Sequence, residues 1–364
     1  MLKNLKICSL FCGCGGSDLG LIGDFEFLGR KYKKLTTEIV FACDNDAHTI
    51  KTYNENFRHK AEVKDVRNCN KKNLPDFDLL VAGFPCQSFS TVNPTKNPFD
   101  ERAQLYNEVA RILEEKQPAF FIAENVKGMM VLKRGEIFKK IIQEFTSKGY
   151  EITHHLINTA DYGVPQKRQR VFMVGVHKSI GFKYKFPNTT HSEIKKKGML
   201  KWEPLSKVID SIIPPDIKYY FSKKAVEGMK NAKNNMKRGL YQDLNHPCLT
   251  ITSHLAKVSL NSRDPVLLVN KTKELYRRFT PLEAGRIQSF PDKFKFVGSE
   301  ARAYKQIGNA ISPVVMWHIA NALFQQIKEN QQKLYSINTN RLSKSNLLLK
   351  GKLQTKRLAG FSSK

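Results

Sequence analysis

A thiol and a carboxyl group each follow a short apolar run in this sequence of 364 residues. Cys86 comes after VAGFP, and Glu124 ends the run AFFIAE. Both runs are typical of strands buried in a parallel sheet, whose ends meet at one edge. A thiolate there can act as a nucleophile while a carboxylic acid donates a proton. For Cys86 alone, a merely buried cysteine is the alternative.

Cationic and amide side chains alternate in the segment QKRQRVFMVG. Gln166, Arg168 and Arg170 are two residues apart, so in a strand their side chains share one face. Arginines entering a buried strand are unusual for a solvated surface. Their guanidinium groups suit a nucleobase oxygen or a phosphate.

A glycine-rich turn, FCGCGG, follows the first apolar run. Gly13, Gly15 and Gly16 allow the backbone to turn sharply and to approach a bound nucleotide. We expect Ser17–Asp18 to cap the helix that follows. An ordinary tight turn between a strand and a helix remains the alternative.

Two further acids follow candidate strands. Asp44 ends the run IVFACD, where a carboxylate can hold ribose hydroxyls through charge-assisted hydrogen bonds. Asp65 follows a candidate strand near residues 61–63 and would be a third polar group on the same sheet edge. An acid at a strand end is often only a helix cap, and Asp46 is the candidate for that part.

The elements that would position these groups alternate along the first 180 residues. Helical periodicity predicts helices at residues 105–115 and 137–145. Between such patterns lie six apolar runs that predict strands, at residues 6–11, 39–43, 79–83, 120–124, 152–157 and 171–176. This alternation predicts an open α/β sheet of buried parallel strands.

The pattern changes at residue 186. Residues 186–276 hold 16 Lys+Arg against 8 Asp+Glu, which predicts a smaller, irregular, basic domain with short strands near 249–252 and 266–269. Helical patterns return at 281–288 and 312–328, so residues 277–330 are expected to complete the domain formed by 1–185. The tail, 331–364, has 8 Lys+Arg and no acid, and we expect it to be disordered.

Charge and composition narrow the class of protein. The formal net charge of +28 suits a polyanion, either nucleic acid or an anionic membrane surface. The longest uncharged stretch, 307–327, is too polar for a membrane span and is expected to pack on a core. Seven cysteines without a CxxC pair indicate neither a disulfide framework nor a zinc site, so we expect no metal and a reducing cytoplasm.

Six segments together resemble the DNA cytosine-5 methyltransferases, in particular those of bacterial restriction–modification systems. They are, in chain order, FCGCGG, GFPCQSFS, ENV, QKRQR, RRFTPLEAGRIQSFP and QIGNAI. The resemblance spans roughly residues 6–323. It implies a Rossmann-like sheet that binds S-adenosylmethionine, with residues 186–276 as a target-recognition domain. It also implies double-stranded DNA as the partner, no membrane, a monomer, and a cognate restriction endonuclease that acts separately.

The resemblance also implies roles for individual residues. Cys86 matches the nucleophile, Glu124 the acid at cytosine nitrogen 3, and Arg168 and Arg170 the groups that organise the base pocket. Expected DNA contacts are Gln166, Thr250, Thr252 and Lys257, with an ordinary β-hairpin as the alternative for the last three. The residues that match cofactor-binding positions are Phe11, Gly13, Gly15, Gly16, Asp44, Asp65, Pro85, Leu105 and Asn309.

Three alternatives differ in substrate or activity. A tRNA cytosine-5 methyltransferase would share the fold, but the large basic block favours duplex DNA. A non-catalytic nucleic-acid-binding protein would not need the intact Cys86, Glu124 and Arg170. A nicotinamide oxidoreductase would rest on the glycine turn alone. Within that turn, Cys12 and Cys14 replace the smaller residues common in the family, which predicts cofactor binding that is sensitive to oxidation.

Overall fold

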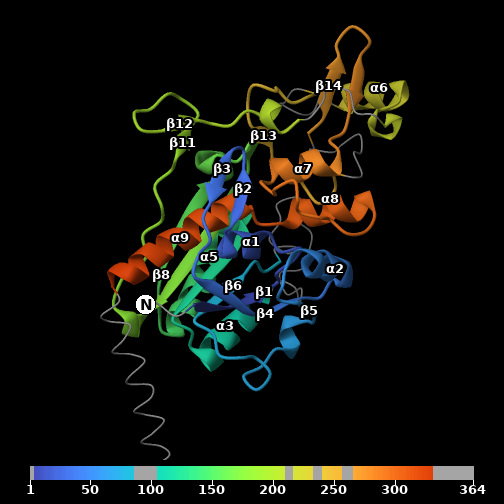
Figure 1. The fold of residues 1–364 in the computed structure, drawn as a ribbon. Coiled ribbons are helices and arrows are strands. Elements are labelled where there is room, and N and C mark those ends of the chain that lie inside the picture. The colour runs from blue at the N-terminus through green and yellow to red at the C-terminus, as the bar shows by residue number, and fades with distance from the viewer. Residues whose placement is uncertain (1–3, 86–104, 210–215, 233–239, 256–264, 331–364) are drawn as a thin grey trace, which may run out of the picture.

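A seven-stranded sheet forms the centre of the protein. The computed structural model describes residues 4–85, 105–209, 216–232, 240–255 and 265–330. In spatial order the strands are β5 (Glu62–Val63), β4 (Thr37–Asp44), β1 (Leu5–Leu10), β6 (Leu79–Ala82), β7 (Phe120–Val126), β10 (Gln169–His177) and β8 (Tyr150–Asn158) (Figure 1). The predicted α/β class is confirmed, and each of the six predicted strands is present.

The sheet is mixed, which corrects the expectation of parallel strands throughout. Strands β5, β4, β1, β6 and β7 run parallel, whereas β10 is antiparallel to both β7 and β8. Only residues 159–168 connect β8 to β10, and they include the short 3-10 helix η4 (Thr159–Tyr162). A parallel pair needs a crossover of about a dozen residues or more, so this short connection joins antiparallel neighbours.

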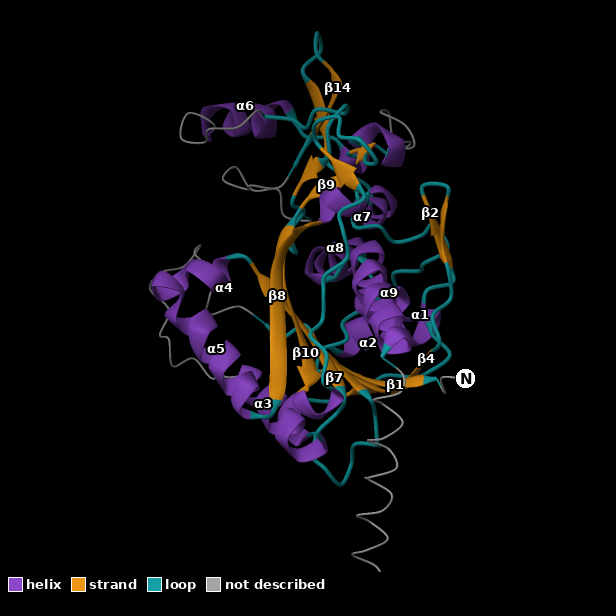
Figure 2. Cartoon of the chain, turned by 90° about the vertical axis from the view of Figure 1, so that its left-hand side faces the viewer, coloured by secondary structure: helices purple, strands orange, loops and turns teal. Residues whose placement is uncertain are grey.

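Helices cover both faces of the sheet (Figure 2). On one face lie α1 (Gly16–Ile22), α2 (Ala47–Asn56) and α9 (Pro313–Glu329), and on the other lie α3 (Leu105–Lys116) and α5 (Glu136–Ser147). The helices predicted at 105–115, 137–145 and 312–328 are therefore confirmed. Burial of apolar side chains between helices and sheet drives this layered arrangement.

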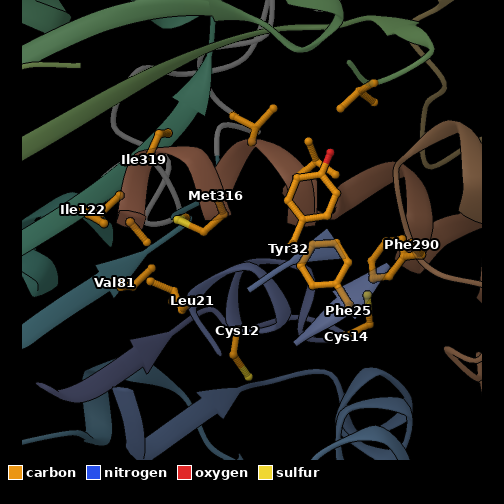
Figure 3. Close-up of a cluster of buried hydrophobic side chains, with 14 of the residues drawn as sticks. Cys12, Cys14, Leu21, Phe25, Tyr32, Val81, Ile122, Phe290, Met316 and Ile319 are labelled. Atoms are coloured by element: carbon orange, nitrogen blue, oxygen red, sulfur yellow. The ribbon is translucent and has the colours of Figure 1, made fainter. Parts of the chain in front are cut away.

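Alternate strand residues point to opposite faces, as the strand period requires. Val81 and Ile122 belong to the same buried cluster as Leu21 of α1 and Met316 and Ile319 of α9 (Figure 3). The neighbouring strand residues enter the cluster on the α3 and α5 face, which includes Leu80, Ala82, Phe121, Ala123, Val109 and Ile141. Two cores thus hold β6 and β7 rigidly between helices.

Smaller elements surround this body. A hairpin, β2 (Phe25–Phe27) with β3 (Arg30–Tyr32), follows α1, and the one-turn helix α4 (Gly128–Val131) precedes α5.

In residues 186–276 the described elements are short: β11 (His191–Ser192), β12 (Leu200–Lys201), the 3-10 helices η6 (Leu205–Val208) and η7 (Ile217–Tyr219), α6 (Lys223–Ala232), β13 (Cys248–Leu249), β14 (Leu267–Asn270) and the start of β15 (Leu275–Arg277). The strand predicted at 249–252 is limited to β13, while β14 matches the second prediction. Figure 1 shows α6 and β14 at the end of the molecule remote from β1 and β4.

The C-terminal part of the described chain returns to the sheet. It contains α7 (Pro281–Ile287), α8 (Glu300–Asn309) and α9. The most apolar 18-residue window within Glu300–Glu329 has a mean hydropathy of 1.2, which would allow a membrane helix, but 67% of that window is buried inside the protein. A break at residues 310–312 also divides it into α8 and α9. This burial supports the prediction that the uncharged stretch packs on the core.

Candidate active site

A cavity of about 370 Å³ opens at the carboxyl edge of the parallel strands. Ligands of open α/β sheets bind at this edge, and the volume lies in the range of small-molecule sites. The cavity brings together residues from the glycine turn, from the ends of β4, β5, β6 and β7, from the start of β10, and from α3 and the end of α8. Those with predicted roles are Phe11, Gly13, Gly16, Asp44, Asp65, Pro85, Leu105, Glu124, Arg168, Arg170 and Asn309.

The glycine turn forms one end of the cavity and leaves no room for a side chain at Gly15 or Gly16. Gly15 has a φ of +96°, and a Cβ placed there would lie 2.2 Å from Cε2 of Phe57. A Cβ on Gly16 would lie 2.4 Å from the carbonyl oxygen of Ile311. The glycines therefore let the turn approach α2 and the loop after α8 more closely than other residues could.

The carboxylate of Asp44 is fixed by backbone donors at the end of β4. It accepts hydrogen bonds from the N–H groups of Gly13 (3.1 Å) and Asp46 (2.9 Å). Burial raises the pKa of Asp44, and the two N–H donors oppose that rise. Asp46 caps α2, accepting from the N–H groups of His48 and Thr49, as the sequence indicated. Capping is thus done by Asp46, and Asp44 lines the cavity.

Asp65 lines the cavity beside Asp44 but has a cationic neighbour. The guanidinium of Arg67 donates to both of its carboxylate oxygens, at 3.0 and 2.8 Å. These bonds lower the pKa of Asp65 and keep it ionised. A ligand that bonded to both oxygens would have to displace the arginine.

Asp18 was taken for a helix cap, and that prediction is wrong. The N-cap of α1 is Gly15, and Asp18 lies inside the helix with no exposed surface. Its carboxylate accepts hydrogen bonds from Ser9 (2.6 Å), Ser17 (3.1 Å) and Tyr53 (2.7 Å). Burial raises the pKa of Asp18. The group ties β1, α1 and α2 together behind the glycine turn, a role that no sequence spacing signalled.

The cysteines of the glycine turn are shielded. Cys12 and Cys14 have exposed fractions of 4% and 1%. Burial raises the pKa of Cys14 to about 12 and that of Cys12 well above its usual range. Since the thiolate is the form that oxidants attack, this environment argues against the oxidation sensitivity expected from the sequence.

Charged side chains form the other end of the cavity. Glu124 near the end of β7 and Arg170 near the start of β10 form an ion pair, with Oε1 and Nε 3.2 Å apart. The side chains are only 13% and 17% exposed. Burial raises the pKa of Glu124, and the charges of Arg170 and Arg168 oppose the rise. A carboxyl group with a raised pKa can carry and donate a proton near neutral pH.

Arg168 lies at the break between β9 (Gln166–Lys167) and β10 and is 3% exposed. Its guanidinium donates to the carbonyl oxygens of Ile251 (3.1 Å), Gly308 (2.9 Å) and Ala310 (3.3 Å). Because its donors bind backbone, Arg168 holds chain segments at the cavity wall, whereas Arg170 faces the carboxylate. The predicted continuous strand through Gln166 is interrupted here.

Gln166 was expected to contact DNA, and the structure corrects this expectation. The side chain is fully buried, donates to Gln288 (2.6 Å) and to the carbonyl of Ile287 (3.2 Å), and accepts from the N–H of Ile251 (3.0 Å). A side chain with these three partners cannot reach DNA without leaving them. Gln288, which the sequence did not single out, shares this buried site.

The remaining predicted residues lie outside the cavity or outside the described residues. Thr250 donates to the carbonyl of Lys167 (2.8 Å), and the hydroxyl of Thr252 accepts from the N–H of His254 (3.1 Å). Cys86 and Lys257 lie outside the described residues. The side chain of Asn125 donates to the carbonyl of Phe84 (3.1 Å) and so joins the ends of β6 and β7.

Comparisons with known proteins show the family of the chain. Residues 5–325 match the family described as C-5 cytosine-specific DNA methylase. The type II methyltransferase M.NgoFVII of Neisseria gonorrhoeae is 30% identical, over 90% of this chain and 89% of its own length. M.FnuDI of Fusobacterium nucleatum, also a type II methyltransferase, is 32% identical, over 90% of this chain and 96% of its own length.

Solved structures share the fold. A DNA modification methyltransferase encoded within a prophage of E. coli is 25% identical, with a TM-score of 0.64 over 89% of this chain and 100% of its own. The Dnmt2 methyltransferase of S. pombe is 20% identical, with a TM-score of 0.66 over 89% of this chain and 99% of its own, and shows likeness of fold alone.

Proposed function

Because the chain belongs to the C-5 cytosine-specific DNA methylase family, we propose that its cavity holds the methyl donor and the target cytosine side by side. The protein is a DNA cytosine-5-methyltransferase of the type II restriction–modification kind. One observation carries the proposal: a single cavity is lined both by Gly16 and Asp44 and by Glu124 and Arg170.

The glycine end fits S-adenosylmethionine, the methyl donor that the family and fold imply. A Cβ on Gly16 would crowd the carbonyl oxygen of Ile311 in the cavity wall, so the close packing there requires glycine. Asp44 presents a carboxylate suited to ribose hydroxyls. Phe11, Pro85, Leu105 and Asn309 would enclose the donor, and Asp65 would meet its adenine amino group. When bound, S-adenosylmethionine supplies an electrophilic methyl group on a sulfonium.

The charged end fits a cytosine ring. We propose that the Cys86 thiolate adds to carbon 6 while protonated Glu124 donates to nitrogen 3, so that the ring electrons move to carbon 5. Carbon 5 then takes up the methyl group. Water takes the carbon 5 proton, which restores the double bond and expels the thiolate, and the nitrogen 3 proton returns to Glu124. Arg170 would bind the base carbonyl, and Arg168 would hold the cavity wall.

The cytosine must leave the duplex to reach this cavity. Flipping costs a few kcal/mol, and contacts inside the pocket offset that cost. While Glu124 is ionised, its ion pair with Arg170 keeps both charges partnered, since an isolated buried charge would be unstable. Burial raises the pKa of Glu124 and so favours uptake of the proton that the reaction needs. Both groups are thus held at the edge where the base would arrive.

Partners and biological role are also proposals. Residues 186–276, with their surplus of basic residues, would bind duplex DNA through phosphates and select the target, with Thr250, Thr252 and Lys257 as candidate contacts. We propose that the chain acts as a monomer in the bacterial cytoplasm. Methylation there would protect cellular DNA from a cognate endonuclease, as the names of the relatives suggest.

Methyl transfer from labelled S-adenosylmethionine tests the proposal. Label is expected in 5-methylcytosine of duplex DNA and not in tRNA, and bisulfite sequencing of that DNA identifies the target site. Label confined to tRNA would support the alternative substrate. The absence of label from diverse duplexes, with correctly folded protein, would remove the proposal.

A further inference from the structure

Two cysteine side chains are in contact behind the cofactor end of the cavity. Sγ of Cys43, near the end of β4, lies 3.9 Å from Sγ of Cys69, which directly follows the 3-10 helix η1 (Val66–Asn68). Both residues are buried, with exposed fractions of 1% and 0%. The proposed methyl transfer uses neither thiol, so their close approach needs an interpretation of its own.

The pair joins the two chain segments that carry the acids of the cofactor end. Cys43 directly precedes Asp44 in β4. On the other side, the thiol of Cys69 donates to the carbonyl of Asp65 (3.9 Å), and the N–H of Cys69 donates to the carbonyl of Val66 (2.9 Å). A movement of either sulfur would therefore reach one of the two acids.

The two thiols differ in acidity. Hydrogen bonding from the S–H group of Cys43 lowers the pKa of Cys69, and burial opposes that effect. The same hydrogen bond, together with burial, raises the pKa of Cys43. Cys69 is thus the thiol that ionises first, whereas burial raises the pKa values of Cys12 and Cys14 in the glycine turn. A thiolate beside a second thiol is the arrangement from which a disulfide forms.

Small oxidants have two approaches to the pair. Cys43 contributes to the wall of the cavity. Cys69 lies in a surface turn, where its neighbours Asn68 and Asn70 are exposed. Local opening of such a turn costs less free energy than unfolding of the sheet. A molecule as small as hydrogen peroxide can therefore reach the sulfurs in the folded chain.

We propose that Cys43 and Cys69 form a reversible disulfide in the presence of peroxide, and that this bond weakens cofactor binding. The Cys69 thiolate attacks one oxygen of hydrogen peroxide, which gives a sulfenic acid and releases hydroxide. The thiol of Cys43 then attacks the sulfenic sulfur, and water leaves as the disulfide forms. Overall, the two thiols lose two electrons and two protons, and one peroxide becomes two water molecules.

The bond would disturb the cofactor end. It would draw the sulfurs roughly 2 Å closer together and would remove the hydrogen bond from Cys69 to Asp65. At least one of the two carboxylates, Asp44 or Asp65, would then leave its place. This effect on binding rests on the proposed function, whereas formation of the bond does not. In a reducing cytoplasm the pair would be oxidised only transiently, so methylation would fall under peroxide and recover afterwards.

The test treats the full chain with hydrogen peroxide and maps its disulfides by mass spectrometry of unreduced peptides. Calorimetric titration then measures S-adenosylhomocysteine affinity before and after oxidation. We expect a Cys43–Cys69 link and at least about fivefold weaker binding, the size of one lost hydrogen bond, with recovery in dithiothreitol. Binding is measured in place of methyl transfer because peroxide would also oxidise the Cys86 thiolate.

Two variants make the result specific. Cys69→Ser keeps a small polar side chain but cannot form the bond, so peroxide should leave its affinity unchanged; Cys69→Ala replaces it if the serine variant does not fold. Cys8→Ala is the matched control, because Cys8 on β1 is buried in the same cluster as Cys43 and Cys69. This control keeps both sulfurs of the pair and should form the link and lose affinity as the wild-type chain does.

The proposal is overturned if peroxide produces no link, if the link joins other cysteines, or if it forms and the affinity is unchanged. Equal losses of affinity in the wild-type chain and in Cys69→Ser would also overturn it. A reduced chain that binds no S-adenosylhomocysteine, although the Cys43–Cys69 link forms on oxidation, would instead contradict the proposed function.

Discussion

The two ends of the cavity differ in the chemical groups that form them. At the cofactor end close backbone packing shapes the wall: Gly15 and Gly16 lie against Phe57 at the end of α2 and Ile311 in the break after α8, and backbone N–H groups hold Asp44. At the base end they are charged side chains, Glu124 and Arg170, that hold each other. Substitutions that add atoms at the cofactor end should therefore weaken cofactor binding, and substitutions that remove a charge or a proton at the base end should slow methyl transfer.

The largest effect is expected at the base end. Glu124→Gln keeps the shape but cannot deliver a proton, so the single-turnover rate of methyl transfer should fall by about 10²–10⁴-fold. The affinity for S-adenosylhomocysteine should stay within about twofold, since the cofactor end is untouched. Glu108→Gln, which alters an ion pair with Arg111 on α3, serves as the control and should keep the rate. A normal rate in Glu124→Gln would show that this carboxyl group is not the acid.

The next effect is expected from one added methyl group. Gly16→Ala would force a Cβ toward the Ile311 carbonyl, and overpacking of about 1–3 kcal/mol corresponds to a roughly fivefold to 150-fold loss of S-adenosylhomocysteine affinity. Calorimetric titration measures it. Gly29→Ala changes a glycine in the β2–β3 hairpin that has a φ of +71°, unlike Gly16, and where a Cβ meets nothing within 4 Å. It should lower stability and leave cofactor affinity unchanged; equal affinity losses in both variants would contradict the distinction.

Asp44→Asn should have a smaller effect at the same end. Both carboxylate oxygens of Asp44 accept backbone N–H groups, whereas an asparagine offers only one acceptor. Loss of one such hydrogen bond, about 1 kcal/mol, predicts a roughly fivefold to tenfold weaker binding of S-adenosylhomocysteine. If affinity were unchanged, Asp44 would not be part of the cofactor end.

The smallest effect is a change with pH. Burial raises the pKa of Glu124, so its protonated form is more stable in the folded than in the unfolded chain. Its contribution to the free energy of unfolding is therefore full below the ordinary value of 4.5 and is lost as pH rises through the raised pKa. Urea unfolding across this range should show a shallower decline in Glu124→Gln. A steeper decline in that variant would reverse the assigned direction.

Much of the framework could be predicted from the sequence. Buried parallel strands read as short unbroken apolar runs, which is why β1, β4, β6 and β7 were found at their residues. Two such runs end near Cys86 and Glu124, and their parallel pairing in the structure places the described ends, Pro85 and Glu124, on one cavity. Local periodicity and strand order are therefore sufficient to predict the strand positions and the sheet edge that the two groups share.

Other features depend on contacts that local patterns do not encode. The antiparallel β10 reads like the parallel strands because it is equally buried. In the sequence, Asp18 stands where a helix cap is expected. In the structure Gly15, in the left-handed conformation, is the N-cap and the helix begins at Gly16, so Asp18 lies inside the helix. Gln166 and Gln288 are 122 positions apart, and their shared burial follows from the return of the chain through α7.

Trapping of a covalent adduct tests the central claim most directly, namely that one cavity carries out thiolate addition to a cytosine under Glu124. A target duplex containing 5-fluorocytosine is incubated with the chain and S-adenosylmethionine, and the product is resolved on a denaturing gel. Fluorine at carbon 5 prevents the final proton loss, so we expect a stable protein–DNA adduct in the wild-type chain and none in Cys86→Ala. Methyl transfer to ordinary DNA without any adduct, or an adduct that persists in Cys86→Ala, would contradict it.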